Sequence, residues 1–442
     1  MTPTVGTDDN QFPLISLSGC VHRGSRFDRR RGTGPGGVVH IPQNRQAFLE
    51  LAPNLGMDWS RRTVLRSSAA VGVLGVAGCL ERLGFEEQSA WETPDMVEDR
   101  PDAVYMPPAS EEMGIYGQDS TDDYVLEVSY TFPHRFWLVA GDRERVDVQP
   151  DDTLHLMMVV WDAETGTVLP VDMSLEITDA DGDLVHGDAP WSMLSQRMGF
   201  HYGDNVDLPG EGTYTASARV GPVSARRTGD LEGRLDEAVT LEVDFEYQRS
   251  DLHDLELNML DDDEQGEPGA LPLMDHSDHD HGHDDGGDHD GHDHHDDLEG
   301  HGHGEHDHPT VSGPPVADLE GTLLGTETTA DAALSALVSD QDRFEEDAPA
   351  LAIFPRTPYN DVILPFMQLS AALEADGETI LETSLTETLD HEFGHHYGVA
   401  APELADADTL VVRVDTPPQV SRHDGYETAF FDFEAVSFDL GS

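Results

Sequence analysis

In Val239-Thr240-Leu241-Glu242-Val243-Asp244-Phe245-Glu246-Tyr247, apolar and polar side chains alternate at every position. Successive side chains of a β-strand point to opposite faces of the sheet, so this pattern predicts a strand with one buried face. Similar alternation occurs in 124–132 and 154–160, and a hairpin turn is predicted at Asp179-Ala180-Asp181-Gly182. Short strands separated by turns at intervals of roughly ten residues predict an all-β fold of the β-sandwich class.

The second half of the chain repeats this pattern. Three motifs recur without a gap at one offset of 195 residues. They are Leu169-Pro170 with Leu364-Pro365, Asp181-Gly182 with Asp376-Gly377, and Gly199-Phe200-His201-Tyr202-Gly203 with Gly394-His395-His396-Tyr397-Gly398. We therefore expect two tandem sandwiches of one architecture, at residues 121–250 and 316–442.

A segment rich in histidine and aspartate separates the two predicted sandwiches. We assign residues 251–315 to a disordered linker, because the 33 residues from His276 to His308 include twelve His and ten Asp. Aspartates alone are typical of a solvated linker, whereas this density of imidazoles indicates weak, interchangeable metal binding. The histidines expected to buffer metal are His276, His279, His281, His283, His289, His292, His294, His295, His301, His303, His306 and His308.

The N-terminal region predicts export and lipid anchoring. Residues 57–79 combine the twin arginines Arg61 and Arg62, a short apolar stretch and a lipobox that ends at Cys79. We predict that lipidated Cys79 anchors the protein to the outer face of the cell membrane. Residues 1–56 are interpreted as a mis-annotated extension before a start at Met57, and residues 80–120 as an acidic tether.

The charge of the chain restricts its function and its source. The sequence has 89 acidic and 24 basic residues, and its formal net charge is −65. A nucleic-acid partner is excluded, because there is little positive charge to neutralise phosphates. Such an acidic surface suits very high salt, where screening suppresses self-repulsion, so we infer a haloarchaeal source.

The first predicted sandwich resembles a known family. Its segment Met193-Leu194-Ser195-Gln196-Arg197-Met198-Gly199-Phe200-His201-Tyr202-Gly203-Asp204-Asn205-Val206, with Pro209-Gly210-Glu211-Gly212-Thr213-Tyr214 after it, resembles the periplasmic iron-transport accessory proteins. The resemblance covers roughly 120–250. It implies an immunoglobulin-like β-sandwich that binds copper or ferrous iron and supports a membrane iron permease.

The same resemblance implies a set of metal ligands. His201 matches the metal histidine of the family, Met193 or Met198 its methionine, and His134 its early histidine. The late histidine is replaced in the first sandwich, by Arg226-Arg227, which implies an incomplete or altered site there. The second sandwich keeps that histidine as His423, and we expect it to form a site with His391, His395 and His396. His155 falls on the polar face of its predicted strand and is expected to be exposed.

A competing motif occurs in the second sandwich. His391-Glu392-Phe393-Gly394-His395 has the H-E-x-x-H spacing of zinc proteases, which requires both histidines one helical turn apart. The surrounding pattern and the matching stretch of the first sandwich both predict β structure, so we do not expect this chemistry.

We predict a non-catalytic, exported protein that captures Fe(II) or Cu(II) as cargo and passes it to an iron permease. No nucleophile–base pair, phosphate loop or dinucleotide motif is recognisable in the sequence. Capture of Zn(II) and a cell-surface scaffold without metal remain the alternatives, and the sequence leaves a homodimer open.

Overall fold

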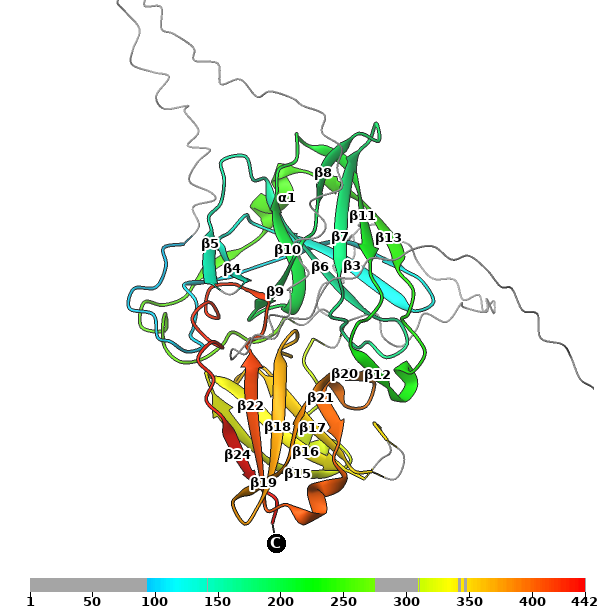
Figure 1. The fold of residues 1–442 in the computed structure, drawn as a ribbon. Coiled ribbons are helices and arrows are strands. Elements are labelled where there is room, and N and C mark those ends of the chain that lie inside the picture. The colour runs from blue at the N-terminus through cyan, green and yellow to red at the C-terminus, as the bar shows by residue number, and fades with distance from the viewer. Residues whose placement is uncertain are drawn as a thin grey trace, which may run out of the picture. The chain divides into compact units, whose positions relative to one another are not determined.

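A computed structural model describes residues 94–140, 142–274, 309, 311–340, 343–345 and 348–441. Their regular structure is almost entirely β, and the strands form two β-sandwiches, which confirms the predicted fold class (Figure 1). All these residues belong to one unit, which begins at Leu80. The N-terminal extension, the export signal and the His-rich segment 275–308 lie outside the described residues.

The first sandwich pairs an eight-stranded sheet, in the order β2-β3-β6-β10-β9-β23-β4-β5, with a four-stranded sheet, in the order β13-β11-β7-β8. The strand bounds are β2 Gly114–Ser120, β3 Tyr124–Thr131, β4 Phe136–Ala140, β5 Asp142–Val146, β6 Leu154–Asp162, β7 Met173–Asp179, β8 Leu184–Asp188, β9 Trp191–Ser195, β10 Gly199–Val206, β11 Gly212–Val220, β13 Val239–Tyr247 and β23 Ser421–Arg422. In β13, Leu241, Val243, Phe245 and Tyr247 are buried and the residues between them are exposed, as the alternation predicts.

The second sandwich has a six-stranded sheet in the order β12-β20-β21-β17-β16-β15 and a four-stranded sheet in the order β19-β18-β22-β24. The bounds are β12 Arg226–Thr228, β15 Thr322–Thr329, β16 Ala332–Ser339, β17 Ala350–Arg356, β18 Gln368–Ala375, β19 Glu378–Ser384, β20 Thr386–Asp390, β21 Gly394–Ala400, β22 Thr409–Thr416 and β24 Val436–Asp439. Several of these lie 195 residues after a strand of the first sandwich, as β20 does after β9.

Two predicted boundaries need correction. Residues 109–120, assigned to the tether, form β1 (Ala109–Glu111) and β2, because the ring of Tyr116 stacks on Tyr130 and Phe245 and draws this segment onto the sheet. Residues 251–259, assigned to the linker, form most of the short helix α1 (Arg249–Asp254) and β14 (Leu257–Met259), and β14 pairs with β1. The first sandwich is therefore larger at both ends than composition indicates.

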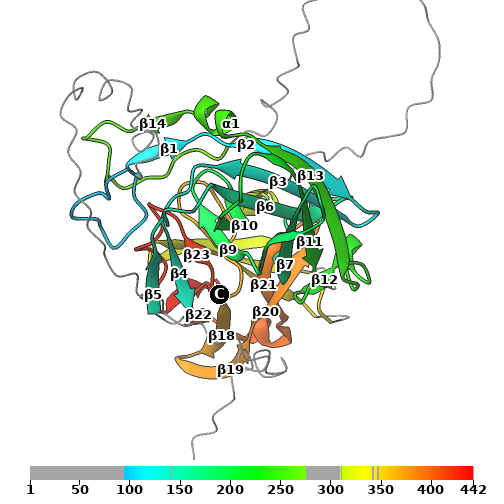
Figure 2. The same ribbon diagram turned by 90° about the horizontal axis from the view of Figure 1, so that it is seen from above.

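The two sandwiches exchange one short strand each (Figure 2). β12, from the first half of the chain, pairs in parallel with β20, with Arg226 opposite Thr388. β23, from the second half, pairs in parallel with β9, with Ser421 opposite Met193. Both residues of the second pair differ by 195 from those of the first, so the exchange is reciprocal and follows the internal repeat.

β23 is held firmly between β9 and β4. Its Arg422 is fully buried and donates hydrogen bonds to the backbone carbonyl oxygens of Pro418 and Val420, the first over 3.1 Å. Burial lowers the pKa of this guanidinium to about 9. Apolar packing also crosses the junction, where the ring of Phe200 lies 6.0 Å from that of Phe366. Local structure here is thus fixed by partners from the other half of the chain.

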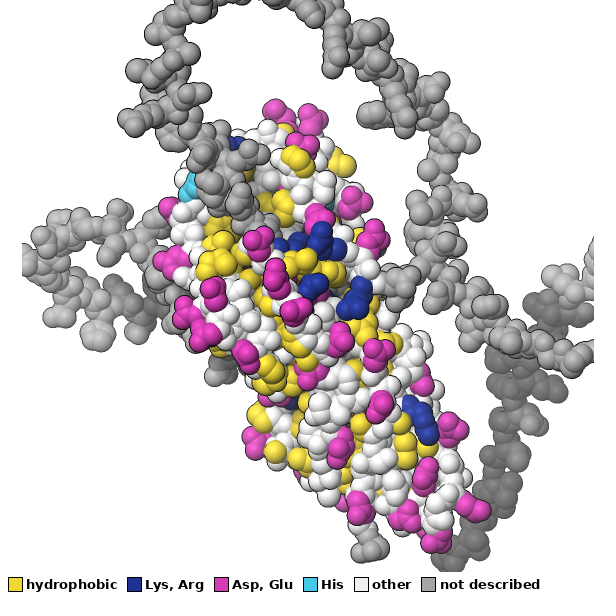
Figure 3. Space-filling model, turned by 90° about the vertical axis from the view of Figure 1, so that its left-hand side faces the viewer, with side chains coloured by type: hydrophobic (Ala, Val, Ile, Leu, Met, Phe, Trp, Pro, Cys, Tyr) yellow, Lys and Arg dark blue, Asp and Glu magenta, His cyan; other side chains and the backbone are white. Residues whose placement is uncertain are grey.

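The surface agrees with the composition. On the face drawn in Figure 3, carboxylates are spread over both sandwiches and arginines are few. Among the described residues, no helix has the length and apolar character needed to cross a membrane.

Candidate metal centre

The centre is built on strand β10, whose pleat separates two kinds of side chain. Phe200 and Tyr202 point into the apolar core of the sandwich and are buried there. His201, Gly203 and Asn205 alternate with them and therefore share the opposite face. The regular alternation of the strand thus places the imidazole of His201, the side-chain-free Gly203 and the amide of Asn205 in a row on one face.

Neighbouring strands add two groups to this face. His155 on β6 lies directly opposite Asn205, and Met193 on β9 lies directly opposite His201. Side chains of directly opposed residues lie on the same face of a sheet, so all of them converge. His155, His201 and Met193 are completely buried, which corrects the expectation that His155 is exposed.

Two connecting segments bring further imidazoles. His134 lies between β3 and β4, and His423 follows β23 directly. Nitrogen atoms of His134, His155 and His423 all lie within 4.8 Å of one another. The ring of His423 is 4.7 Å from that of His134 and 5.1 Å from that of His201. Four histidines from four segments therefore surround one buried space.

Hydrogen bonds orient these imidazoles. The Nδ1 of His155 lies 2.9 Å from Oδ1 of Asn205, whose amide nitrogen donates to the backbone oxygen of His134 over 2.9 Å. Because Oδ1 can only accept, His155 carries its proton on Nδ1. The Nδ1 of His201 similarly donates to the carbonyl oxygen of Gly199 over 3.1 Å. Both rings therefore present an unprotonated Nε2 to the space.

His134 is oriented by a carboxylate. Its Nδ1 lies 3.0 Å from Oε2 of Glu111 and 3.0 Å from the carbonyl oxygen of Phe132. The Nε2 atoms of His134, His155 and His201 are buried and have no hydrogen-bond partner among the described residues. A buried polar atom without a hydrogen-bond partner is energetically unfavourable. Several such nitrogen atoms that face one space are typical of a metal-binding site.

The thioether of Met193 and a glycine, Gly203, complete the centre. The sulfur of Met193 is 3.2 Å from Nε2 of His423, so both can bind one ion. A Cβ at Gly203 would lie 2.8 Å from Nε2 of His155 and 3.3 Å from the Met193 sulfur. Glycine at this position therefore keeps the space between the ligands open.

Burial makes three of the imidazoles poor bases. It lowers the pKa of His201 to about 4, and the pKa values of His155 and His423 are held well below the ordinary value by burial and by the neighbouring imidazoles. Burial also acts to lower the pKa of His134, but the charge and hydrogen bond of Glu111 outweigh it and raise that pKa. At neutral pH the first three are neutral, which is the form that binds metal.

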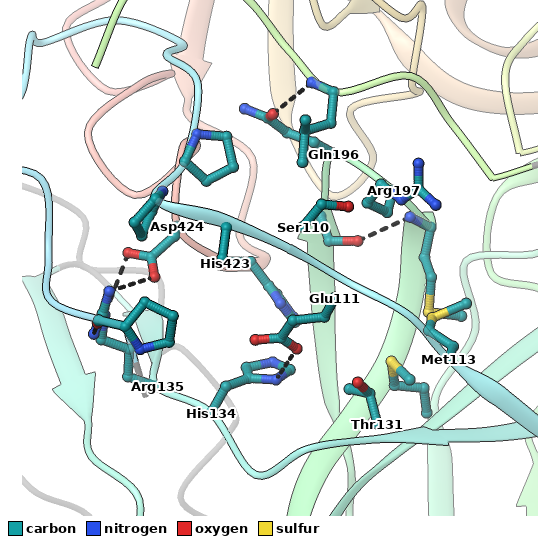
Figure 4. Close-up of a pocket in the computed structure, with 18 residues that line it drawn as sticks. Ser110, Glu111, Met113, Thr131, His134, Arg135, Gln196, Arg197, His423 and Asp424 are labelled. Carbon is teal, nitrogen blue, oxygen red and sulfur yellow. Dashed lines mark hydrogen bonds and ion pairs between the residues drawn. The ribbon is translucent and has the colours of Figure 1, made fainter. Parts of the chain in front are cut away.

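A pocket of about 90 Å³ borders the centre, with which it shares His134 and His423 (Figure 4). His134 and His423 form part of its wall, beside Glu111, and the ion pair of Arg135 with Asp424 lies next to them. The pocket gives an ion or a small ligand a path to two of the four imidazoles.

The structure brings together four of the residues predicted as ligands, namely His134, Met193, His201 and His423. Met198 is buried in the wall of the pocket. The expectation that the first sandwich lacks its late histidine is wrong, because β23 carries His423 into it from the second half of the chain. Sequence reasoning missed His155 as a member of the centre, and it also missed Asn205, which orients His155, and Glu111, which orients His134.

The other three histidines of the second sandwich lie apart from this centre. His395 pairs with Glu387 over 2.9 Å, and His396 is buried among aromatic rings. His391 is partly exposed and lies 3.4 Å from a carboxylate oxygen of Asp230. The expected site that joins them to His423 is therefore not formed.

The H-E-x-x-H spacing does not occur on a helix. His391 and Glu392 lie in a turn, and His395 lies in β21. A turn followed by a strand does not place the two imidazoles one above the other, as a zinc protease needs. The twelve linker histidines, from His276 to His308, and Arg61, Arg62 and Cys79 lie outside the described residues.

We expect Asn205→Ala to weaken metal binding about 10- to 100-fold, the usual effect of losing a group that orients a ligand. The change removes the acceptor that fixes His155 and the donor to the His134 carbonyl oxygen. It should also lower the free energy of unfolding by about 1–3 kcal/mol. Isothermal titration with Cu(II) and thermal unfolding measure the two effects. Asn258→Ala, on the exposed strand β14, is the control and should change neither; equal affinities for the two variants would contradict the assigned role.

The chain was compared with protein families, curated proteins and solved structures. Residues 317–439 match a family described as a domain of unknown function (DUF7350). A search of curated proteins finds no match. Among solved structures, the chain is similar to FetP of uropathogenic Escherichia coli strain F11, as isolated after expression in the periplasm, with 19% identity and a TM-score of 0.25 over 31% of this chain and 96% of FetP. A copper-bound variant of FetP matches at 19% identity and a TM-score of 0.24, over 31% of this chain and 97% of FetP.

Proposed function

We propose that this protein is a carrier that takes up a copper ion, or ferrous iron, at the centre formed by His134, His155, His201, His423 and Met193. One observation carries the proposal: four imidazoles, three of them with buried Nε2 atoms that have no partner among the described residues, converge on a space kept open by glycine. A structural role alone would leave these nitrogen atoms bonded to protein groups.

The donor set favours copper among the candidate ions. Imidazoles bind copper, iron and zinc, but a thioether is a soft ligand that selects copper, above all Cu(I). Affinities of divalent ions also peak at Cu(II) for a site of given ligands. The absence of thiolate from the set keeps the ion exchangeable, as cargo must be. Ferrous iron is the second candidate, and the thioether does not favour zinc.

Titration of one matched pair of variants tests this proposal. His155→Ala should weaken Cu(II) binding by at least about tenfold, because it removes one imidazole and the partner of Asn205. His186→Ala, a partly exposed histidine of β8 outside the centre, should leave it unchanged. Both are measured by isothermal titration with Cu(II), and anaerobically with Fe(II). If the parent protein binds no ion tightly, and His155→Ala lowers only its stability, the protein is a scaffold instead.

We include the His-rich segment in the proposal as a reservoir of weakly bound ions. Both of its described flanks lie beside the turn that precedes His201. The amide of Met274 donates to the carbonyl oxygen of Arg197 over 2.9 Å, and Val311 packs against Gly199. Arg197 and Leu271 also line the pocket. Ions released from the segment would therefore be close to the pocket that leads to the centre.

Replacing all twelve histidines of the segment by Asn should remove several weakly bound ions per chain and leave the tight one. The removed ions should be those that dissociate near pH 5–6, because exposed imidazoles take up protons around pKa 6.5. The tight ion should persist to lower pH, since burial lowers the pKa values of three of its four imidazoles, those of His155, His201 and His423. Elemental analysis after dialysis at stepped pH values measures both. An unchanged ion count would identify the segment as a solvated linker only.

Export and anchoring belong to the same proposal. The twin arginines Arg61 and Arg62 and the lipobox at Cys79 support an extracytoplasmic protein held at the membrane by lipid. A carrier in that place would pass its ion to a membrane permease, and it needs no catalytic groups to do so.

A further inference from the structure

The second sandwich contains a position-by-position counterpart of the centre. His396 lies opposite Thr388 on β20, as His201 lies opposite Met193 on β9. Its Nδ1 donates to the carbonyl oxygen of Gly394 over 3.1 Å, the same bond and distance as in His201. Burial also lowers its pKa to about 4, and its Nε2 has no hydrogen-bond partner among the described residues.

The other ligands have been replaced at the matching positions. Ala350 lies opposite Ala400, where the first sandwich pairs His155 with Asn205. Thr388 takes the position of Met193, and Thr228 on the exchanged strand β12 takes that of His423. A methyl group and two hydroxyls therefore stand where the centre has two imidazoles and a thioether, and of the four positions compared only that of His396 keeps a metal-binding side chain.

An aromatic ring occupies the matching space. Gly398 corresponds to Gly203, but a Cβ there would meet the ring of Phe344, with Cε2 at 2.7 Å. In the first sandwich the corresponding Cβ would meet ligand atoms of His155 and Met193. The ring of Phe344 lies 6.2 Å from that of His396, and the rings of Phe354 and Phe393 lie within 5.7 Å of it.

A fixed cation lies beside the filled space. The guanidinium of Arg343 is 3.7 Å from the centre of the Phe393 ring and pairs with the buried Asp390 and with Glu392. The hydroxyl of Thr228 donates to the same carboxylate of Asp390 over 2.7 Å. The exchanged strand β12 is therefore tied down by a protein cation and a carboxylate.

We propose that the second sandwich holds a closed counterpart of the metal centre, filled by Phe344 and supplied with positive charge by Arg343, and that it takes up a copper ion only when this plug is removed and ligands are restored. The inference rests on the proposed function of the first centre. According to this inference each chain binds one tight ion, although the His-Tyr-Gly motif occurs twice, at His201 and at His396.

The test uses the full chain with its twelve linker histidines replaced by Asn. Cu(II) is titrated, and the bound ions are counted by elemental analysis after desalting. The starting protein should bind one ion, and His396→Ala should leave both the count and the affinity unchanged. Phe344→Ala combined with Thr228→His and Thr388→Met should bind a second ion. The matched control with Thr228→His and Thr388→Met but with Phe344 retained should bind one.

Each outcome is decisive. The inference would be overturned if His396→Ala lost an ion, or if the control that retains Phe344 bound two ions. A folded triple variant that binds one ion would also overturn it. If circular dichroism shows that the triple variant does not fold, the His396→Ala result decides. A starting protein that binds no tight ion would refute the proposed function, and this inference with it. If the starting protein binds one ion, which is lost in His155→Ala, and the folded triple variant also binds only one, the inference alone is refuted.

Discussion

His423→Ala should abolish tight metal binding in the first sandwich, with Cu(II) affinity reduced by at least about 100-fold. The expected effect is large because losing only the support of a ligand already reduces affinity 10- to 100-fold, and this change removes a ligand and leaves the Met193 sulfur without its partner. Bound metal should also cease to raise the unfolding temperature, since stabilisation by a ligand follows its affinity. Isothermal titration and thermal unfolding with and without Cu(II) measure both effects.

The matched control is His391→Ala, in the same half of the chain. His391 is partly exposed and contacts Asp230, outside the centre, so its loss should leave Cu(II) binding intact. Metal-free stability should fall little in either variant, because neither side chain is part of the apolar core. Equal Cu(II) affinity in the two variants would show that β23 does not supply a ligand.

Gly203→Ala should reduce Cu(II) affinity about as strongly as His423→Ala does, although it removes no ligand. The new methyl group would lie 2.8 Å from Nε2 of His155, closer than real Cβ contacts, and 3.3 Å from the Met193 sulfur. The ion would have to share this space, so either the ligands move apart or the ion is excluded. The backbone of Gly203 is not in the left-handed region, so strain in the main chain does not add to the effect.

Gly210→Ala is the control for this substitution. A Cβ at Gly210 meets nothing within 4 Å, and its backbone is also outside the left-handed region. We expect unchanged titration curves for this variant. If Gly203→Ala binds Cu(II) as the parent protein does, the ion does not occupy the space between His155 and Met193.

The fold could be predicted because its signals are local. Alternation in 239–247 indicates a one-sided strand, and the offset of 195 residues identifies the second sandwich. The ends were harder to predict. Segments 109–120 and 249–259 are polar in composition, and a few contacts, such as Tyr116 on Phe245, decide that they join the fold.

The centre could be predicted only in part. The corner at His201 and the methionine at Met193 are recognisable in the sequence, but His155 was assigned to an exposed face. Its strand carries the signal that corrects this: Met157, Val159 and Trp161 on the same face are all apolar, and a strand with two apolar faces is buried on both. The polar residue in such a strand needs a buried partner, here Asn205.

The source of the last ligand had no signal in the sequence. Each half of the chain predicts a complete sandwich, and nothing in Arg422-His423 indicates which one it joins. Reciprocal exchange swaps equivalent strands, so hydrophobic pattern and register fit either arrangement equally well.

The reciprocal exchange of β12 and β23 has a consequence for biosynthesis. Within the described part of the chain, β4 pairs with β5 and β23 and with no other strand, so the hairpin β4–β5 is joined to the rest of its sheet through β23. Among the described strands, β24 alone follows β23 in the chain. A chain that is interrupted before β23 would hold three of the imidazoles, without the fourth and without a closed sheet. If the centre binds metal as proposed, an interrupted chain would lack one of its ligands, so tight binding would depend on synthesis of β23 and His423.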